Sequence, residues 1–192
     1  MSRLVVLISG NGSNLQAILD ACKDGRLEAH VMAVLSNNPQ AHGLERARQA
    51  GVPAHAIEWA DTDRKLYDAQ LADAVAAYRP NWVVLAGWMR LLSMEFLERF
   101  PNQVINLHPA LPGQFPGLRA IERAYQAFQR GEINETGVMI HTVPDEGVDC
   151  GPVLAQQSLT IEPDETLESL QERIHALEHE LLIKTLEGLT GP

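Results

Sequence analysis

Cysteine is scarce in this sequence of 192 residues. The two cysteines present, Cys22 and Cys150, lie far apart and match no spacing that is typical of a metal or redox site. Proteins of oxidising compartments often carry several cysteines as a disulfide framework, and nothing of that kind is present. The scarcity therefore favours a reduced, cytoplasmic protein.

Long apolar runs are also lacking. No stretch reaches the roughly 18 consecutive apolar residues that a membrane-spanning helix needs. After Met1, Ser2 and Arg3 the chain enters the apolar run Leu4–Ile8, which is too short for a signal-peptide core and has no small-residue cleavage site after it. We expect a soluble protein that is neither secreted nor associated with a membrane.

Positive charge is in the minority. The 15 Lys and Arg residues face 25 Asp and Glu residues, which gives a formal net charge of −10. Nucleic acids and anionic membranes are held mainly by clustered Lys and Arg, so neither is an expected partner. Internal repeats and low-complexity tracts are lacking too, and the length suits a single core. We expect residues 1–192 to form one domain.

Short apolar runs alternate with helical patterns in the first half of the chain. Tyr67, Leu71, Val75 and Tyr78 recur every three to four residues, which predicts a one-faced helix that ends before Pro80. Parallel strands need such crossover helices between them. The pattern therefore predicts an α/β fold, a doubly wound and mostly parallel sheet with helices on both faces. The predicted buried strands are Leu4–Ile8, Val31–Leu35, Trp82–Leu85 and Val104–Leu107.

The second half has a different order of elements. Val138–Val143 and Val153–Leu159 flank the turn-rich segment Pro144–Pro152, which predicts two strands that reverse around a loop. This antiparallel region is followed by a helix, because Leu167, Leu170, Ile174, Leu177 and Leu181 keep the helical period. In sheets of this kind ligands bind beyond the carboxyl ends of the strands.

A glycine-containing loop joins the first strand to a helix. It reads Ser9-Gly10-Asn11-Gly12-Ser13-Asn14, and the helical pattern begins at Leu15. Glycines let the backbone approach a ligand closely, and the free amides of a helix start attract an anion. The segment matches neither the dinucleotide fingerprint nor a Walker loop, so it favours a monophosphate. The alternative is that Ser13 or Asn14 only caps the helix.

Two polar side chains follow the strand at Val104. Asn106 and His108 are two residues apart, so they face the same side of a strand and can reach one ligand. Asn supplies an amide donor for a developing oxyanion, and His can donate to that oxygen or carry a proton near neutral pH. The pair suits a reaction that passes through a tetrahedral intermediate, such as acyl transfer.

A carboxylate is expected near this pair. The loop between the two later strands carries Asp145, Glu146 and Asp149 among glycines. A carboxylate beside His108 would favour its charged form and fix its tautomer. Asp149 is our choice among the three. For a single Asn or His at a strand end, an ordinary structural hydrogen bond is an equally good interpretation.

Four separate segments give the chain a family resemblance. They are Val6–Leu15, Leu85–Leu92, Asn106–Pro109 and Val148–Pro152. In order and spacing they resemble the phosphate loop, the folate segment, the catalytic pair and the catalytic aspartate of the phosphoribosylglycinamide formyltransferases. This family uses 10-formyltetrahydrofolate in purine synthesis and has a Rossmann-like fold. The resemblance covers nearly the whole chain, and it supports the choice of Asp149.

The resemblance implies a role for each group of residues. The formyl group of 10-formyltetrahydrofolate, a cosubstrate, would pass to the amine of 5′-phosphoribosylglycinamide (GAR) without a metal. Asn106 and His108 would stabilise the intermediate, and Asp149 would orient His108. The other implied residues are Gly12, Ser13 and Asn14 at the GAR phosphate, Glu178 at the glycinamide, Arg64, Met89, Arg90, Leu91 and Leu92 at the folate, and His141 in support.

Other interpretations stay open. His175, Glu178 and His179 match an H-x-x-E-H pattern of zinc enzymes, and Cys150 could be a nucleophile with His108 or His141 as its base. A formyltetrahydrofolate hydrolase and a non-catalytic nucleotide-binding module are the alternatives in function. For the oligomeric state, a homodimer is one of the alternatives that the sequence leaves open.

Overall fold

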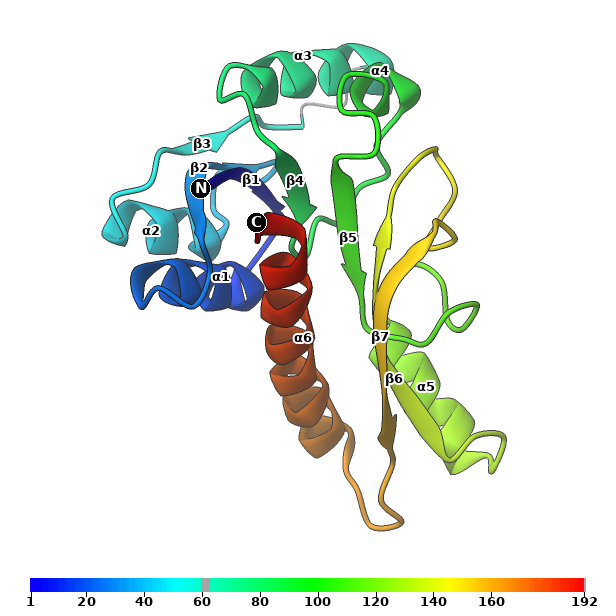
Figure 1. Ribbon diagram of the computed structural model, residues 1–192. Helices are drawn as coiled ribbons and strands as arrows, with labels where there is room; N and C mark the ends of the chain where they lie inside the picture. Colours follow the sequence, from blue (N-terminus) through cyan, green and yellow to red (C-terminus); the bar gives the residue numbers. More distant parts are fainter. Residues whose placement is uncertain (60–62, 192) are drawn as a thin grey trace.

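A seven-stranded sheet forms the centre of the computed structural model, which describes residues 1–59 and 63–191 (Figure 1). Its strand order is β3-β2-β1-β4-β5-β6-β7. The first strands are parallel, whereas β6 is antiparallel to both β5 and β7. The strands are β1 (Ser2–Ile8), β2 (Ala29–Ser36), β3 (Ala54–Ala56), β4 (Trp82–Leu85), β5 (Val104–His108), β6 (Glu135–Thr142) and β7 (Val153–Thr160).

This arrangement confirms the predicted doubly wound, mostly parallel sheet with an antiparallel C-terminal region. Strand β1 lies between β2 and β4, so the chain builds the sheet outward in one direction and then in the other. The loops that follow β1 and β4 therefore leave the sheet toward opposite faces. The crevice between them is where ligands bind in sheets of this kind.

Helices cover both faces of the sheet. On one face lie α1 (Ser13–Lys23), α2 (His42–Gln49), α5 (Ala120–Gln129) and α6 (Leu167–Thr190), and on the other lie α3 (Arg64–Ala76) and α4 (Met94–Leu97). Each face has its own buried apolar cluster. In β1, Leu4, Val6 and Ile8 pack into the first cluster and Val5 and Leu7 into the second. Because both faces are covered, the strand is apolar at successive positions and does not alternate.

Helix α6 runs along the sheet and contacts α1, α5, β6 and β7 (Figure 1). Its predicted apolar stripe is confirmed, because Leu170, Ile174, Leu177 and Leu181 are buried. The helix begins after Thr166, whose side-chain oxygen accepts a hydrogen bond from the Ser169 amide at 3.2 Å. Within residues 1–59 and 63–191, no helix combines the length and the apolar content that crossing a membrane requires.

The largest differences from the sequence prediction concern β3 and α3, whereas β2 and β6 differ only in their bounds. Strand β3 has only three residues and was not predicted, since so short a run carries no periodic signal. Helix α3 ends at Ala76, so Tyr78 lies beyond the helix. The Tyr78 amide donates to the Val75 carbonyl in a closing turn, and Arg79 follows with a positive φ of 47°.

The cap of α6 yields a stability prediction. Replacing Thr166 by Ala removes the acceptor for the Ser169 amide, so we expect the free energy of unfolding to fall by about 1 kcal/mol. Thr166→Ser retains the hydroxyl and should match the unchanged protein. Urea denaturation of the three proteins measures the difference, and equal stability of the Ala and Ser variants would show that the cap contributes nothing.

Candidate active site

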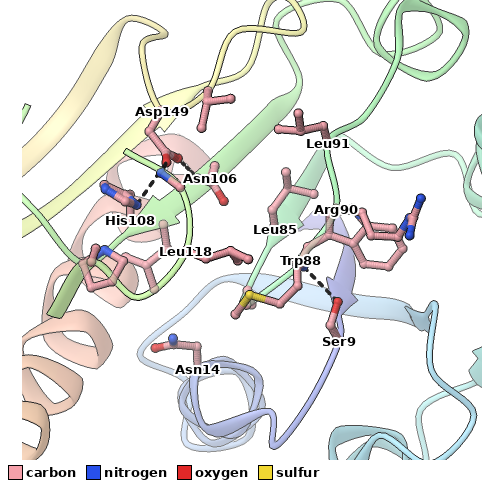
Figure 2. A pocket seen from close by; sticks show the side chains of 18 of the residues that line it. Ser9, Asn14, Leu85, Trp88, Arg90, Leu91, Asn106, His108, Leu118 and Asp149 are labelled. Carbon is pink, nitrogen blue, oxygen red and sulfur yellow. Dashed lines mark hydrogen bonds and ion pairs between the residues drawn. The ribbon is translucent and has the colours of Figure 1, made fainter. Parts of the chain in front are cut away.

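A cavity of about 1090 Å³ opens at the carboxyl ends of β1, β4 and β5. Its walls come from the loops after these strands, from the loop between β6 and β7, and from α6. Figure 2 shows Asn106, His108 and Asp149 together on one side, Asn14 on α1, and Arg90 and Leu91 across the cavity. Volumes of about 300–1,000 Å³ are usual for small-molecule sites, so this cavity is a large one.

The glycine-containing loop leads into α1 as predicted. Gly12 is the N-cap of α1, with a left-handed φ of 77° that favours glycine. Neither Ser13 nor Asn14 caps the helix, and no side chain of the described residues donates or accepts a capping bond there. The alternative of a plain capping role is thereby excluded. The first amides of α1 remain available to an anion, and Gly10, Gly12, Ser13 and Asn14 all line the cavity.

Helix α2 supports this loop from behind. A β-carbon added to Gly12 would lie 2.7 Å from the Gly43 Cα, so the two backbones meet where no side chain fits. The Gly43 amide donates to the Gly10 carbonyl at 3.1 Å. Arg46 donates from Nε to the Asn11 carbonyl at 2.9 Å and from Nη2 to Asn11 Oδ1 at 3.0 Å. The shape of the loop is therefore fixed by α2.

Glu178 and Asn14 form a buried polar corner of the cavity. Their exposed fractions are only 6% and 8%. Burial raises the pKa of Glu178 to about 7, although the Asn14 amide favours the ionised form. Asn14 Oδ1 has no hydrogen-bond partner among the described residues. A ligand group that carries hydrogens, such as an amine, could donate both to Asn14 Oδ1 and to the Glu178 carboxyl group.

The Asp149 carboxylate is the centre of the polar cluster. Oδ1 accepts from Asn106 Nδ2 at 3.0 Å, and Oδ2 accepts from the Gly117 amide at 2.7 Å. His108 Nδ1 lies 3.3 Å from Oδ2, and His141 Nε2 lies 3.5 Å from Oδ1. Burial alone would raise the pKa of Asp149, but His141, the Gly117 amide and His108 outweigh it and lower this pKa below its ordinary value. Asp149 is therefore ionised at neutral pH.

The other two acids of this loop have different partners. Asp145 accepts from the Gly147 amide within its own loop. Glu146 forms an ion pair with Arg64 and also accepts from the Met94 amide at 3.1 Å. Only Asp149, of these three, contacts the predicted catalytic pair. Arg64, predicted at the folate, is engaged with Glu146 and is not among the residues that line the cavity.

Hydrogen bonds define the roles of Asn106 and His141. His141 Nδ1 lies 2.9 Å from the Thr142 carbonyl, which can only accept, so this nitrogen carries a hydrogen. In the neutral imidazole, Nε2 then accepts from Asn106 Nδ2 at 3.1 Å. Both amide hydrogens of Asn106 are thus in use, one with His141 and one with Asp149. His141 thus contacts Asn106, and its supporting role in the reaction stays a prediction.

His108 differs from the prediction in its charge. We expected Asp149 to keep the imidazole protonated, but burial lowers the pKa of His108 by more than Asp149 raises it. The lowered pKa favours the neutral ring at pH 7, and Nδ1 is the ring nitrogen that lies next to Asp149. Its Nε2 is buried, has no hydrogen-bond partner among the described residues, and belongs to a residue that lines the cavity. A neutral Nε2 in this position can accept a proton.

The predicted folate segment forms the opposite wall. Met89 and Leu91 are 62% and 48% exposed although they are apolar, whereas Leu92 is buried. Exposed apolar side chains that line a cavity suit a flat apolar ligand. The guanidinium carbon of Arg90 lies 3.5 Å from the centroid of the Trp59 ring. The sequence did not point to Trp59, because 31 residues separate the two and no motif links them.

The remaining motifs do not form sites. His175 and Glu178 line the main cavity, but His179 lines a separate hollow between α1 and α6. Among the described residues, no three His, Cys, Asp or Glu side chains are grouped to hold a metal ion. Cys150 is exposed and is not among the residues that line the cavity. The nucleophilic alternative therefore has no support in the geometry.

The loop after β5 contributes more than its sequence indicated. Gly113, Phe115, Gly117 and Arg119 all have positive φ, so the chain turns repeatedly. Arg123 donates to the carbonyls of Phe115 and Pro116 and fixes this path. The Gly117 amide thereby reaches Asp149. Sequence reasoning missed this backbone donor, since only the folded loop brings it near the carboxylate.

Comparisons with known proteins agree with this geometry. The sequence profile of the formyl transferase family matches residues 2–186. A phosphoribosylglycinamide formyltransferase of Schizosaccharomyces pombe is 47% identical over 98% of this chain and 97% of its own length. One from Escherichia coli is 43% identical over 92% of this chain and 81% of its own length.

Solved structures give the same result. Glycinamide ribonucleotide transformylase 1 from Symbiobacterium toebii superposes with a TM-score of 0.92 at 42% identity, over 99% of this chain and 88% of the other. The corresponding structure from Geobacillus kaustophilus has a TM-score of 0.92 at 41% identity and full coverage of both chains. The fold described above is therefore shared with these transformylases.

The raised pKa of Glu178 predicts a pH-dependent stability. A carboxyl group whose pKa rises from 4.5 to about 7 on folding contributes full stability below pH 4.5 and loses it as the pH rises through 7. We expect Glu178→Gln to be more stable than the unchanged protein at pH 8, by on the order of 3 kcal/mol, and equally stable near pH 5. Denaturant unfolding at both pH values measures this. A constant difference between the two pH values would contradict it.

Proposed function

This chain belongs to the formyl transferase family, and from that premise we propose that it transfers a formyl group from 10-formyltetrahydrofolate to the amine of GAR. The observation that carries the proposal is the geometry of one cavity. An anion site, a buried carboxylate and an apolar wall surround the cluster of Asn106, His108 and Asp149. Each part fits one portion of the two substrates.

The ribonucleotide fits the α1 side of the cavity. Its phosphate would accept from the free amides of Ser13 and Asn14 at the start of α1, where the helix dipole also favours an anion. Its glycinamide amine would then lie near Glu178, whose carboxyl group is buried beside the Asn14 amide. The negative net charge of the chain does not oppose this, because the anion is held by local amides.

The folate fits the opposite side. Met89 and Leu91 offer apolar surface to its ring system, and Arg90 and Leu92 border the same wall. The formyl group would point from this wall toward His108 and Asn106. Arg64 reaches a folate carboxylate only by leaving Glu146, and we therefore place it at the margin of the site.

His108 carries the proton in the proposed mechanism. The GAR amine attacks the formyl carbon, and its nitrogen becomes positive while the formyl oxygen becomes negative. The neutral Nε2 of His108 accepts a proton from that nitrogen. The resulting imidazolium is stabilised by Asp149 and stabilises the oxyanion. His108 then returns the proton to the departing folate nitrogen as the carbon–nitrogen bond breaks.

Asn106 and Asp149 prepare the site for this step. Asn106 would donate to the oxyanion after releasing His141, while its second hydrogen stays on Asp149. The carboxylate would fix the Nδ1–H tautomer of His108, which leaves Nε2 as the nitrogen without a hydrogen. No metal ion takes part in this scheme. The hydrolase and the non-catalytic binding module are less favoured, because the relatives are transferases and the site has a complete proton-transfer group.

A turnover assay tests the proposed activity. We expect the absorbance change of deformylation only when both GAR and 10-formyltetrahydrofolate are present. Deformylation without GAR would indicate a hydrolase instead. Binding of GAR without any turnover would indicate a nucleotide-binding module.

Two matched loop variants test the choice of carboxylate. Asp149→Asn removes the charge that orients His108, so we expect kcat to fall about a hundredfold or more. Asp145→Asn retains the acceptor for the Gly147 amide and should keep kcat within about twofold. Circular dichroism confirms that both variants are folded. If Asp149→Asn retained full kcat, the assigned mechanism would be wrong.

A further inference from the structure

The wall formed by Trp88–Leu92 is anchored by burial only at its ends. Trp88 and Leu92 are 7% and 4% exposed, and both pack into the apolar cluster on the α3 side of the sheet. Between them Met89 and Leu91 are largely exposed. Side-chain packing therefore does not hold the middle of the wall, and its position depends on other contacts.

Ser9 provides the first of these contacts. Its hydroxyl accepts from the Met89 amide at 2.9 Å, marked by the dashed line from Ser9 in Figure 2, and donates to Asn37 Oδ1 at 2.6 Å. The Ser9 amide also donates to the Gly87 carbonyl at 3.1 Å. Gly87 has a φ of 81°, so the chain turns away from β4 there. Met89 lies beyond the end of β4, and the Ser9 hydroxyl is the acceptor for its amide.

Trp59 provides the second contact. Its ring lies under the Arg90 guanidinium, and Tyr67 packs edge-on against that ring at 5.1 Å between centroids. Tyr67 is buried and its hydroxyl donates to the Ile57 carbonyl, so the aromatic pair is fixed. The Trp59 amide donates to the Asn37 carbonyl at 3.4 Å. Asn37 therefore contacts both residues. Its side chain accepts from Ser9, and its carbonyl accepts from the Trp59 amide.

We propose that Ser9 and Trp59 are positioning residues for the formyl donor, acting through the backbone of Met89 and the side chain of Arg90. The proposal rests on the proposed function, since it takes this wall as the folate side. Ser9 is the first residue of the glycine-containing loop, yet its hydroxyl serves the opposite substrate.

Steady-state kinetics of Ser9→Ala test this. The variant leaves the Met89 amide without its acceptor, so we expect the KM for 10-formyltetrahydrofolate to rise about fivefold to tenfold. The KM for GAR should stay within about twofold. Ser9→Thr keeps the hydroxyl and should restore the low KM, and Ser158→Ala on the exposed strand β7 is the matched control. A rise in the KM for GAR alone, or no change in either KM, would overturn the proposal.

Trp59 variants test the second contact in the same way. Trp59→Leu removes the aromatic face under Arg90, so the KM for the donor should rise by a similar factor. Trp59→Tyr keeps an aromatic face and should remain close to the unchanged protein. Equal KM values for the Leu and Tyr variants would exclude a role of the stacked ring.

A binding measurement separates this proposal from the proposed function. Calorimetry with 10-formyltetrahydrofolate alone should show weaker binding by Ser9→Ala than by the unchanged protein. If the unchanged protein bound the donor but did not transfer the formyl group, the proposed function would be refuted and the positioning role would stand. Equal binding by both proteins refutes the positioning role, and no binding by either refutes both.

Discussion

The negative charge of Asp149 is buried at the meeting point of three segments, and the order of the site depends on satisfying it. Its side chain is only 11% exposed, and its backbone has the left-handed φ of 50°. A buried carboxylate must be surrounded by donors. Strand β5 supplies Asn106 and His108, the loop after β5 supplies the Gly117 amide, and His141 on β6 binds the other amide hydrogen of Asn106. One charge thereby fixes two loops and the orientation of the His108 ring.

The sheet topology explains why two chemically different ligand regions share one cavity. The chain leaves β1 and β4 in opposite directions, so the loop that ends in α1 and the segment that ends in Leu92 border a common space. The polar end of a neighbouring strand, β5, lies beside both. A reaction between a phosphate-bearing nucleophile and an apolar donor needs this arrangement, because both must reach His108 at once. The antiparallel β6 and β7 then return the chain so that Asp149 faces the same space.

Patterns in the sequence predicted most of the architecture and the pair Asn106 and His108, whereas the choice of Asp149 came largely from the family resemblance. The buried strands were predicted from continuous apolar runs. The spacing of two residues predicted that Asn106 and His108 lie on the same face of their strand. The sequence could not predict the charge of His108, because the burial that lowers its pKa is a property of the packed fold. Nor could it show that Arg64 pairs with Glu146, or that Trp59 lies under Arg90. These contacts join distant segments without a periodic pattern or a motif.

The backbone contact between Gly12 and Gly43 has a thermodynamic consequence for ligand binding. Glycines in an unsupported loop would sample many conformations. Binding of an anion to such a loop would then be opposed by the loss of conformational entropy. Here α2 and the forked Arg46 immobilise the loop when the protein folds. The entropy of ordering the anion site is lost during folding and not during the encounter with the ligand. In the proposed function, a larger share of the interaction energy of the GAR phosphate would then appear as affinity.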